Sequence, residues 1–149
     1  MMNDKEYMIR QISVFIDNRP AMLAEMARTL ANKCINLRAL SLAEARDFGT
    51  TRFIVTDVEA CIKVLRETGY HFIETDVLAV EVADRPGGMA DVLECIASEH
   101  ISVEYAYAML EKHEGFAVII LRVDNPGKAI MALRKKNIHL LTKEDIALL

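Results

Sequence analysis

An internal repeat constrains the fold of this 149-residue chain more than any other feature of its sequence. Arg19-Pro20 precedes a helical pattern of apolar residues, and Arg85-Pro86 precedes another one 66 residues later (85 − 19). In both copies a strand pattern comes next, with residues 34–37 matching residues 100–103. Toward the end of each copy the offset becomes 68 (139 − 71), so the second copy contains two additional residues. The chain is therefore two copies of one structural unit of about 70 residues, near the lower limit for a self-sufficient core.

The repeated turn has the chemistry of a strand that leads directly into a helix. In the second copy, residues 77–82 alternate as in a strand, and a helical pattern begins at Met89. Pro86 fixes φ near the helical value and lacks the N–H that a helix start leaves unpaired. Gly87 and Gly88 leave the backbone uncovered, so a ligand can approach its N–H groups closely. Because a helix start favours negative charge, the turn predicts a position for a carboxylate or another anion.

Periodicity predicts the same order of elements in both copies. In the first copy we expect strands over residues 8–17, 34–44, 50–56 and 70–75, helices over 20–33 and 58–68, and a hairpin turn at 46–49. In the second copy we expect strands over residues 77–83, 101–110, 116–123 and 138–141, a helix over 87–99, a helix starting at Asn125-Pro126 and a tail helix opening at Thr142. Each copy is then a β-α-β-β-α-β unit, an α+β ferredoxin-like fold with its helices on one face of an antiparallel sheet. The expected domains are residues 1–75 and 76–149.

Composition and charge exclude several classes of protein. A net charge of −4 argues against nucleic acid or an anionic membrane as the main partner. The sequence has no signal peptide and no apolar run that could span a bilayer, so we expect a cytoplasmic protein. Its three cysteines, Cys34, Cys61 and Cys95, are widely spaced and fall on or at the ends of predicted helices. We expect them to be buried free thiols.

No motif in the sequence indicates catalysis or metal binding. His100 and His113 have no cysteine or histidine partner at metal-ligand spacing. No Ser-His-Asp or Cys-His arrangement can be argued from the spacing, so we expect no enzyme activity, no metal and no cofactor. Tyr105 and Tyr107 lie on one side of a predicted strand, where packing in a core or dimer interface is favoured over stacking on a ligand.

The order of a strand, Asp-Arg-Pro-Gly-Gly, a helix and a His-Ile-Ser-Val strand resembles an ACT domain. Asn-Arg-Pro-Ala-Met followed by Cys-Ile-Asn-Leu resembles a second one, and the resemblance covers about residues 8–141. The chain is similar to stand-alone tandem ACT proteins. This resemblance implies a non-catalytic regulatory module that binds a free amino acid. It also implies two sheets side by side, a ligand at their interface, and a homodimer or a partner metabolic enzyme.

The expected ligand site comprises both turns: Asn18, Arg19, Ala21, Met22, Leu23, Asp84, Arg85, Gly87, Gly88 and Met89. The amides of residues 21–23 and 87–89 would bind the ligand carboxylate. Asp17, Asn18 and Asp84 would accept hydrogen bonds from its ammonium group, and Met22, Leu23 and Met89 would line the pocket for its side chain. Arg19 and Arg85 could instead be solvated or pair with a neighbouring acid.

The two turns differ in a way that predicts unequal sites. Gly87-Gly88 leaves the backbone bare, whereas the first copy has Ala21-Met22 at these positions. The second turn is therefore expected to admit a ligand more closely. Which amino acid would bind stays open.

Three other functions are compatible with the same order of elements. A ligand-free regulatory subunit could dimerise through exposed strands and control a partner enzyme. An RNA-recognition module is disfavoured because residues 116–121 are apolar and the chain is acidic. A small ferredoxin-like enzyme would need a reactive group of side chains, and the sequence offers none.

Overall fold

The computed structural model describes residues 3–17, 19–43 and 48–149. The chain divides into two compact units. The first unit comprises Arg10–Thr75 with Ala147–Leu149, and the second comprises Met1–Ile9 with Asp76–Ile146. The segment that precedes the first repeat thus packs with the second repeat.

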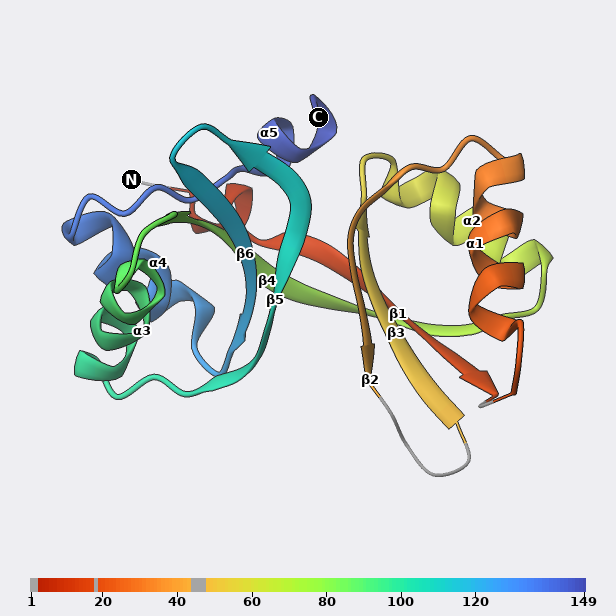
Figure 1. Cartoon of the computed structure of the whole chain (residues 1–149), viewed down its shortest axis with the longest axis horizontal. Helices are drawn as coiled ribbons and strands as arrows, with labels where there is room; N and C mark the ends of the chain where they lie inside the picture. The colour runs from red at the N-terminus through yellow and green to blue at the C-terminus, as the bar shows by residue number, and fades with distance from the viewer. Residues whose placement is uncertain (1–2, 18, 44–47) are drawn as a thin grey trace. The chain divides into compact units, whose positions relative to one another are not determined.

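The first unit is a two-layered arrangement of a sheet and two helices built from the first repeat. Its elements are β1 (Ile9–Asp17), α1 (Met22–Asn32), β2 (Leu37–Ala43), β3 (Phe48–Val55), α2 (Val58–Glu67) and the start of β4 (His71–Ala83). Both β1 and β2 pair antiparallel with β3. Figure 1 shows α1 and α2 together on one face of this sheet. Alternate residues of β1 meet the apolar stripes of both helices there, around the fully buried Phe53.

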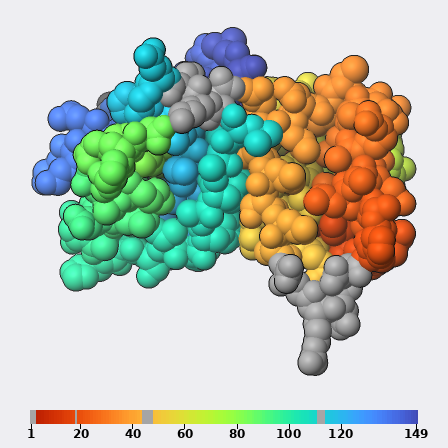
Figure 2. All heavy atoms as spheres, viewed as in Figure 1, coloured from red at the N-terminus to blue at the C-terminus, as the bar shows by residue number. Residues whose placement is uncertain are grey.

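The second unit repeats this plan. Its elements are the short 3-10 helix η1 (Asp4–Glu6), the remainder of β4, α3 (Gly88–Ser98), β5 (Val103–His113), β6 (Phe116–Val123), α4 (Pro126–Lys135) and α5 (Lys143–Ala147). β4 and β5 pair antiparallel with β6. Figure 1 shows α3 and α4 on one face of the sheet, and α3 forms part of the unit's outer surface in green in Figure 2. The α+β class, the ferredoxin-like units and the antiparallel pairing are confirmed; the side-by-side placement of the two sheets stays a prediction.

Three of the predicted strands are wrong in extent. Residues 70–75 and 77–83 form one continuous strand, β4, because no glycine or proline interrupts the chain between them. The strand predicted at residues 138–141 is reduced to a single bridge between Val80 and Leu140. Hydrogen bonds from Glu81 N to His139 O and from Leu141 N to Ala79 O, both 2.9 Å, flank this bridge. The segment therefore lies beside β4 without extending into a full strand.

Side chains cap the starts of several helices. Asp57 accepts a hydrogen bond from Ala60 N at 3.0 Å, and Asn125 accepts one from Lys128 N at 3.1 Å. Thr142 and Asp145 exchange hydrogen bonds at the start of α5, which is a variant of the capping box. Beyond α4, Asn137 adopts a φ of 57°, as expected for a residue that ends a helix. Of the hairpin turn predicted at 46–49, residues 46 and 47 lie outside the described residues, while Phe48 and the next residue belong to β3.

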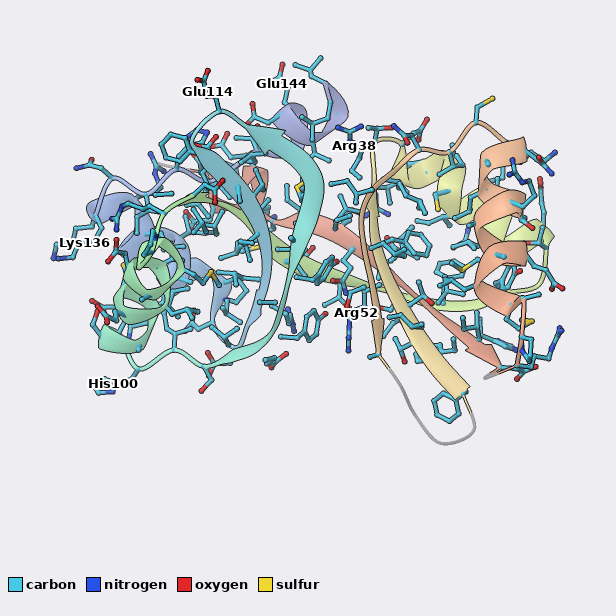
Figure 3. All side chains as sticks on the ribbon, viewed as in Figure 1. Arg38, Arg52, His100, Glu114, Lys136 and Glu144 are labelled. Atoms are coloured by element: carbon cyan, nitrogen blue, oxygen red, sulfur yellow. The ribbon has the colours of Figure 1, made fainter. Side chains whose placement is uncertain are left out.

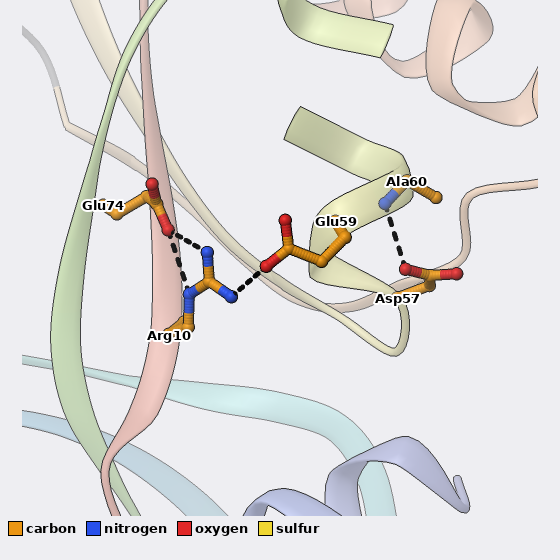
Figure 4. A network of polar contacts seen from close by, with 5 residues as sticks. All are labelled: Arg10, Asp57, Glu59, Ala60 and Glu74. Carbon is orange, nitrogen blue, oxygen red and sulfur yellow. Dashed lines mark hydrogen bonds and ion pairs between the residues drawn. The ribbon is translucent and has the colours of Figure 1, made fainter. Parts of the chain in front are cut away.

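Arg10 joins three elements of the first unit (Figure 4). Its guanidinium on β1 donates to the carboxylate of Glu59 on α2 and to that of Glu74 on β4. These hydrogen bonds raise the pKa of Arg10, with the Glu59 contact the larger cause. Because its partners come from distant parts of the sequence, the network orients β1 relative to α2 and β4.

Gly88 is the residue at which the second turn tolerates no side chain. A Cβ there would collide with the carbonyl oxygen of Ala83, a rigid backbone atom that cannot move aside. We expect Gly88→Ala to lower the free energy of unfolding by at least about 2 kcal/mol. Gly127→Ala is the matched control, because its Cβ would meet only Asp4 Oδ2 at 3.8 Å. Chemical denaturation of both variants measures the difference, and equal stabilities would contradict the close packing at Gly88.

Candidate functional site

The two strand-to-helix turns share one backbone conformation. Arg19 N donates to Asp17 O and Arg85 N donates to Ala83 O, in both cases at 2.9 Å. Ala21 and Gly87 then adopt left-handed conformations, with φ of 70° and 86°. A left-handed alanine is uncommon, so the fold imposes this turn on the first unit even without glycine.

The arginines of both turns pair with an acid six residues later. Arg85 Nη2 lies 2.6 Å from Asp91 Oδ2, and Arg19 Nη2 lies 3.9 Å from Glu25 Oε2. Arg85 also donates to the carbonyl of Pro86 at 3.1 Å. This confirms the alternative in which these arginines pair with neighbouring acids. All four side chains are more than half exposed, so water screens the pairs and each contributes little to stability.

The amides predicted to bind a carboxylate are partly used by the turns themselves. Gly88 N donates to Arg85 O at 3.0 Å, and Met22 N donates to Arg19 O at 3.4 Å. The close contact between Gly88 and Ala83 gives a structural reason for this glycine. Since Met22 occupies the equivalent position in the first unit, the two turns share hydrogen bonds but not this packing.

The remaining predicted site residues lie in three kinds of environment. Met22 and Leu23 pack against the core of the first unit, and Met89 packs against that of the second. Asp17 and Asp84 are exposed at the ends of their strands, and Asn18 lies outside the described residues. The apolar side chains thus belong at least partly to the two cores, and their role toward a ligand stays a prediction.

A pocket of about 270 Å³ opens at the N-terminal end of α3, and we call it the Gly88 pocket. Its lining combines acidic, apolar and hydrogen-bond-donating side chains with the backbone of the turn: Glu81, Ala83, Gly88, Asp91, Val92, Phe116, Asn137, Ile138 and His139. All of these residues belong to the second unit. The predicted turn therefore borders a real pocket, although only Gly88 of the predicted residues lines it.

Glu81 is the acidic group that the fold brings to this pocket without a cationic partner. It lies on β4, and its N–H bonds to the carbonyl of His139, which sets the two residues side by side. Within the described part of the chain, the half-buried Glu81 carboxylate forms no ion pair. Such a group can accept hydrogen bonds from a cation that enters the pocket.

Sequence reasoning missed Glu81, Phe116 and residues 137–139 as parts of a site. For Glu81 a signal existed, because it is the only charged residue in the apolar run 77–82. Residues 137–139 gave no comparable signal, since their place depends on how the chain turns at Asn137 after α4.

The other candidate groups show no catalytic arrangement. Among the described side chains of residues 3–17, 19–43, 48–110 and 114–149, no cluster of three or more histidines, cysteines or acids could hold a metal ion. The rings of Tyr105 and Tyr107 stack with their centroids 6.5 Å apart, and both are half-buried. None of the described helices is long and apolar enough to cross a membrane.

The cysteines differ from the expectation in one case. Cys61 and Cys95 are buried free thiols, as predicted, but Cys34 is exposed just after α1. Burial, with a smaller contribution from Asp57, raises the pKa of Cys61 to about 12. Burial also raises the pKa of Cys95, and Lys136 opposes this in part. Figure 3 shows Lys136 at the surface, extending away from the unit.

Comparison with known proteins identifies relatives for nearly the entire chain. A family model described as an ACT domain pair matches residues 7–149. Protein BT0572 from Bacteroides thetaiotaomicron is 33% identical, with a TM-score of 0.89, 96% of this chain covered and 98% of that one. The ligand-free regulatory subunit of aspartate kinase from Thermus thermophilus is 17% identical, with a TM-score of 0.64 and coverage of 87% and 92%. The corresponding subunit from Thermus flavus is 19% identical, with a TM-score of 0.55 and coverage of 85% and 90%. Among curated proteins, none matches this chain.

The three thiols should differ in reactivity. At pH 8, we expect a thiol reagent such as Ellman's reagent to modify Cys34 quickly and Cys61 and Cys95 only after unfolding. The thiolate is the reactive form, and a raised pKa keeps the two buried thiols protonated at this pH. Counting modified thiols in native and denatured protein checks this, and Cys34→Ser should remove the fast phase. Fast native modification of all three thiols would contradict the structure.

Proposed function

The chain belongs to the ACT domain family, and on this basis we propose that it is a non-catalytic regulatory module that binds a free amino acid. The single observation that carries the proposal is the Gly88 pocket at the start of α3, which Glu81 helps to line. Within the described residues, the Glu81 carboxylate forms no ion pair. A zwitterionic ligand brings a cation and an anion together, and this lining offers partners for both. Binding at an interface of two ACT domains stays a prediction.

The ammonium group of the ligand would be held by the acidic side of the pocket. Glu81 can accept its hydrogen bonds in full, whereas Asp91 is already paired with Arg85. Charge-assisted hydrogen bonds of this kind contribute about 1.5–3 kcal/mol each. Glu81 is therefore the residue on which we expect ligand affinity to depend most strongly.

The carboxylate of the ligand would lie at the opposite side of the pocket. The side chains of Asn137 and His139 carry N–H donors there. The positive end of the α3 dipole favours an anion at the same place, consistent with the role predicted for the turn of residues 84–89. Because Gly88 N is committed to Arg85 O, these side chains would replace part of the amide cradle predicted from the sequence.

The ligand side chain would contact an apolar wall. Val92, Phe116 and Ile138 form this wall, and Phe116 remains 44% exposed. The pocket, at about 270 Å³, is smaller than the usual range for drug-sized ligands. We therefore propose a single amino acid with an apolar side chain as ligand.

Another protein would respond to the change that ligand binding causes in this module. Regulatory subunits of aspartate kinase share this fold. By this analogy we propose that the responding protein is a second copy of the chain, in a homodimer, or a partner metabolic enzyme. Ligand binding would favour one conformation of the module over another, and the partner protein would respond to that change.

The first test is thermal unfolding against a panel of the standard amino acids. At a hundred times its dissociation constant, a ligand adds about 2.7 kcal/mol of stability, which should raise the melting temperature by roughly 5–10 °C. Calorimetric titration of the responding amino acid then gives its affinity. A flat panel would favour the ligand-free regulatory subunit that controls a partner through protein contacts alone.

The second test places the ligand. Glu81→Gln should weaken binding by roughly 10- to 100-fold, because it removes a charge-assisted hydrogen bond. Glu94→Gln is the matched control, since Glu94 is an acid on α3 that does not line the Gly88 pocket. Unchanged affinity in Glu81→Gln would exclude this pocket, even if the panel had identified an amino acid.

A further inference from the structure

A second cavity of the same unit contains a cation instead of an acid. It measures about 380 Å³, and we call it the Arg134 cavity. Its lining residues are Tyr7, Arg134, Asn137, Ile138, His139, Leu140 and Thr142. Asn137, Ile138 and His139 also line the Gly88 pocket, so this short segment forms a wall shared by two cavities.

Arg134 enters this cavity from the last turn of α4. Its guanidinium lies over the ring of Tyr7, with Cζ 5.2 Å from the ring centroid. Tyr7 is fixed in turn by the hydrogen bond from its N–H to Asp4 O at 3.1 Å, just after η1. The N-terminal segment therefore supplies the aromatic surface that holds the guanidinium in place.

The Arg134 guanidinium lacks the acid that a partly buried arginine normally has. Its Nη1 is buried and has no hydrogen-bond partner, and the described part of the chain contains no carboxylate paired with it. A buried N–H without an acceptor is unfavourable. The ring of Tyr7 offsets part of this cost but provides no oxygen acceptor.

The cavity as a whole favours a negative charge. None of its seven lining residues is acidic, and Arg134 is the only arginine or lysine among them. Asp145, which adjoins Thr142, is occupied by hydrogen bonds from Thr142 N at 2.7 Å and Thr142 Oγ1 at 2.9 Å. An anion entering the cavity would therefore meet a cation without having to displace an acid.

Arg134 differs in this respect from the lysines that follow it. Lys135 is exposed at the end of α4, and Lys136 extends into solvent (Figure 3). The three basic residues are consistent with a helix C-terminus, where positive charge is favoured. Of the three, only Arg134 packs on an aromatic ring. The favourable charge at the helix C-terminus does not explain this contact.

We propose that the Arg134 cavity is a binding site for a small oxyanion, the carboxylate or phosphate group of a metabolite. The planar guanidinium suits two oxygen atoms of such a group, and the side chains of Asn137 and His139 provide further N–H donors. This site adjoins the Gly88 pocket and shares Asn137, Ile138 and His139 with it, but its charged residue is Arg134 and not Glu81.

The test measures oxyanion binding to the full chain. Sodium phosphate and sodium acetate are titrated separately at constant ionic strength, with sodium chloride as the balance, and binding is followed by NMR and thermal unfolding. We expect saturable binding of at least one of the two, and the one that saturates identifies the group. No saturation with either anion would overturn the proposal.

Matched variants assign the binding to Arg134. Arg134→Gln should lower the affinity at least about tenfold, as expected for loss of a charge-assisted hydrogen bond. Lys135→Gln removes a positive charge one residue away and should change the affinity for the anion less than about twofold. Equal effects of the two variants would show a general charge effect and overturn the proposal.

A further variant tests the site without a change that is expected to unfold the protein. Asn137→Gly retains the left-handed backbone at φ 57° but removes one donor, so it should remain folded and bind the anion more weakly. If Asn137→Gly binds the anion with unchanged affinity, Asn137 is not part of the site. If Arg134→Gln also binds it with unchanged affinity, the proposal is overturned. Glu81→Gln should leave oxyanion binding intact, so failure here is distinguishable from failure of the proposed amino-acid site.

Discussion

The turn that joins a strand to a helix in each repeat is the constraint on which the remaining structure depends. An arginine N–H bonds to the carbonyl two residues earlier, and the chain then passes through a left-handed residue before the helix begins. This geometry directs α1 and α3 back across their sheets. In the second unit the helix starts so close to the strand that only glycine fits beside Ala83. The position of the Gly88 pocket follows from that close approach.

Glu81 and Arg134, two partly buried charged residues of the second unit, have no charged partner among the described residues. Glu81 helps to line one cavity and Arg134 another, and residues 137–139 line both. In a folded domain most partly buried charges are paired, because desolvation penalises an isolated one. Arg10 of the first unit, bound by Glu59 and Glu74, shows the usual outcome. The two proposed ligand sites are both built on these groups.

Much of the fold could be predicted because its signals are local. An apolar run predicted β6 over its full length, and Asn125-Pro126 identified the start of α4. Errors arose where the outcome depended on distant contacts. Sequence could not show that β4 continues through Asp76, or that Cys34 remains exposed after its helix ends. The extent of the last strand depended on how far it could pair with β4.

The sequence by itself determined the two repeats, their ferredoxin-like plan, the paired turns and the family to which these belong. Repeat spacing and periodicity suffice for this because both act over short stretches of chain. Only the tertiary structure decided which side chains share a cavity. Glu81 and His139 are 58 residues apart in the sequence (139 − 81) and meet through one backbone hydrogen bond. Tyr7 and Arg134 are farther apart still, and they meet because η1 packs with the second unit. Such encounters depend on the packing of whole elements, which no local pattern of residues records.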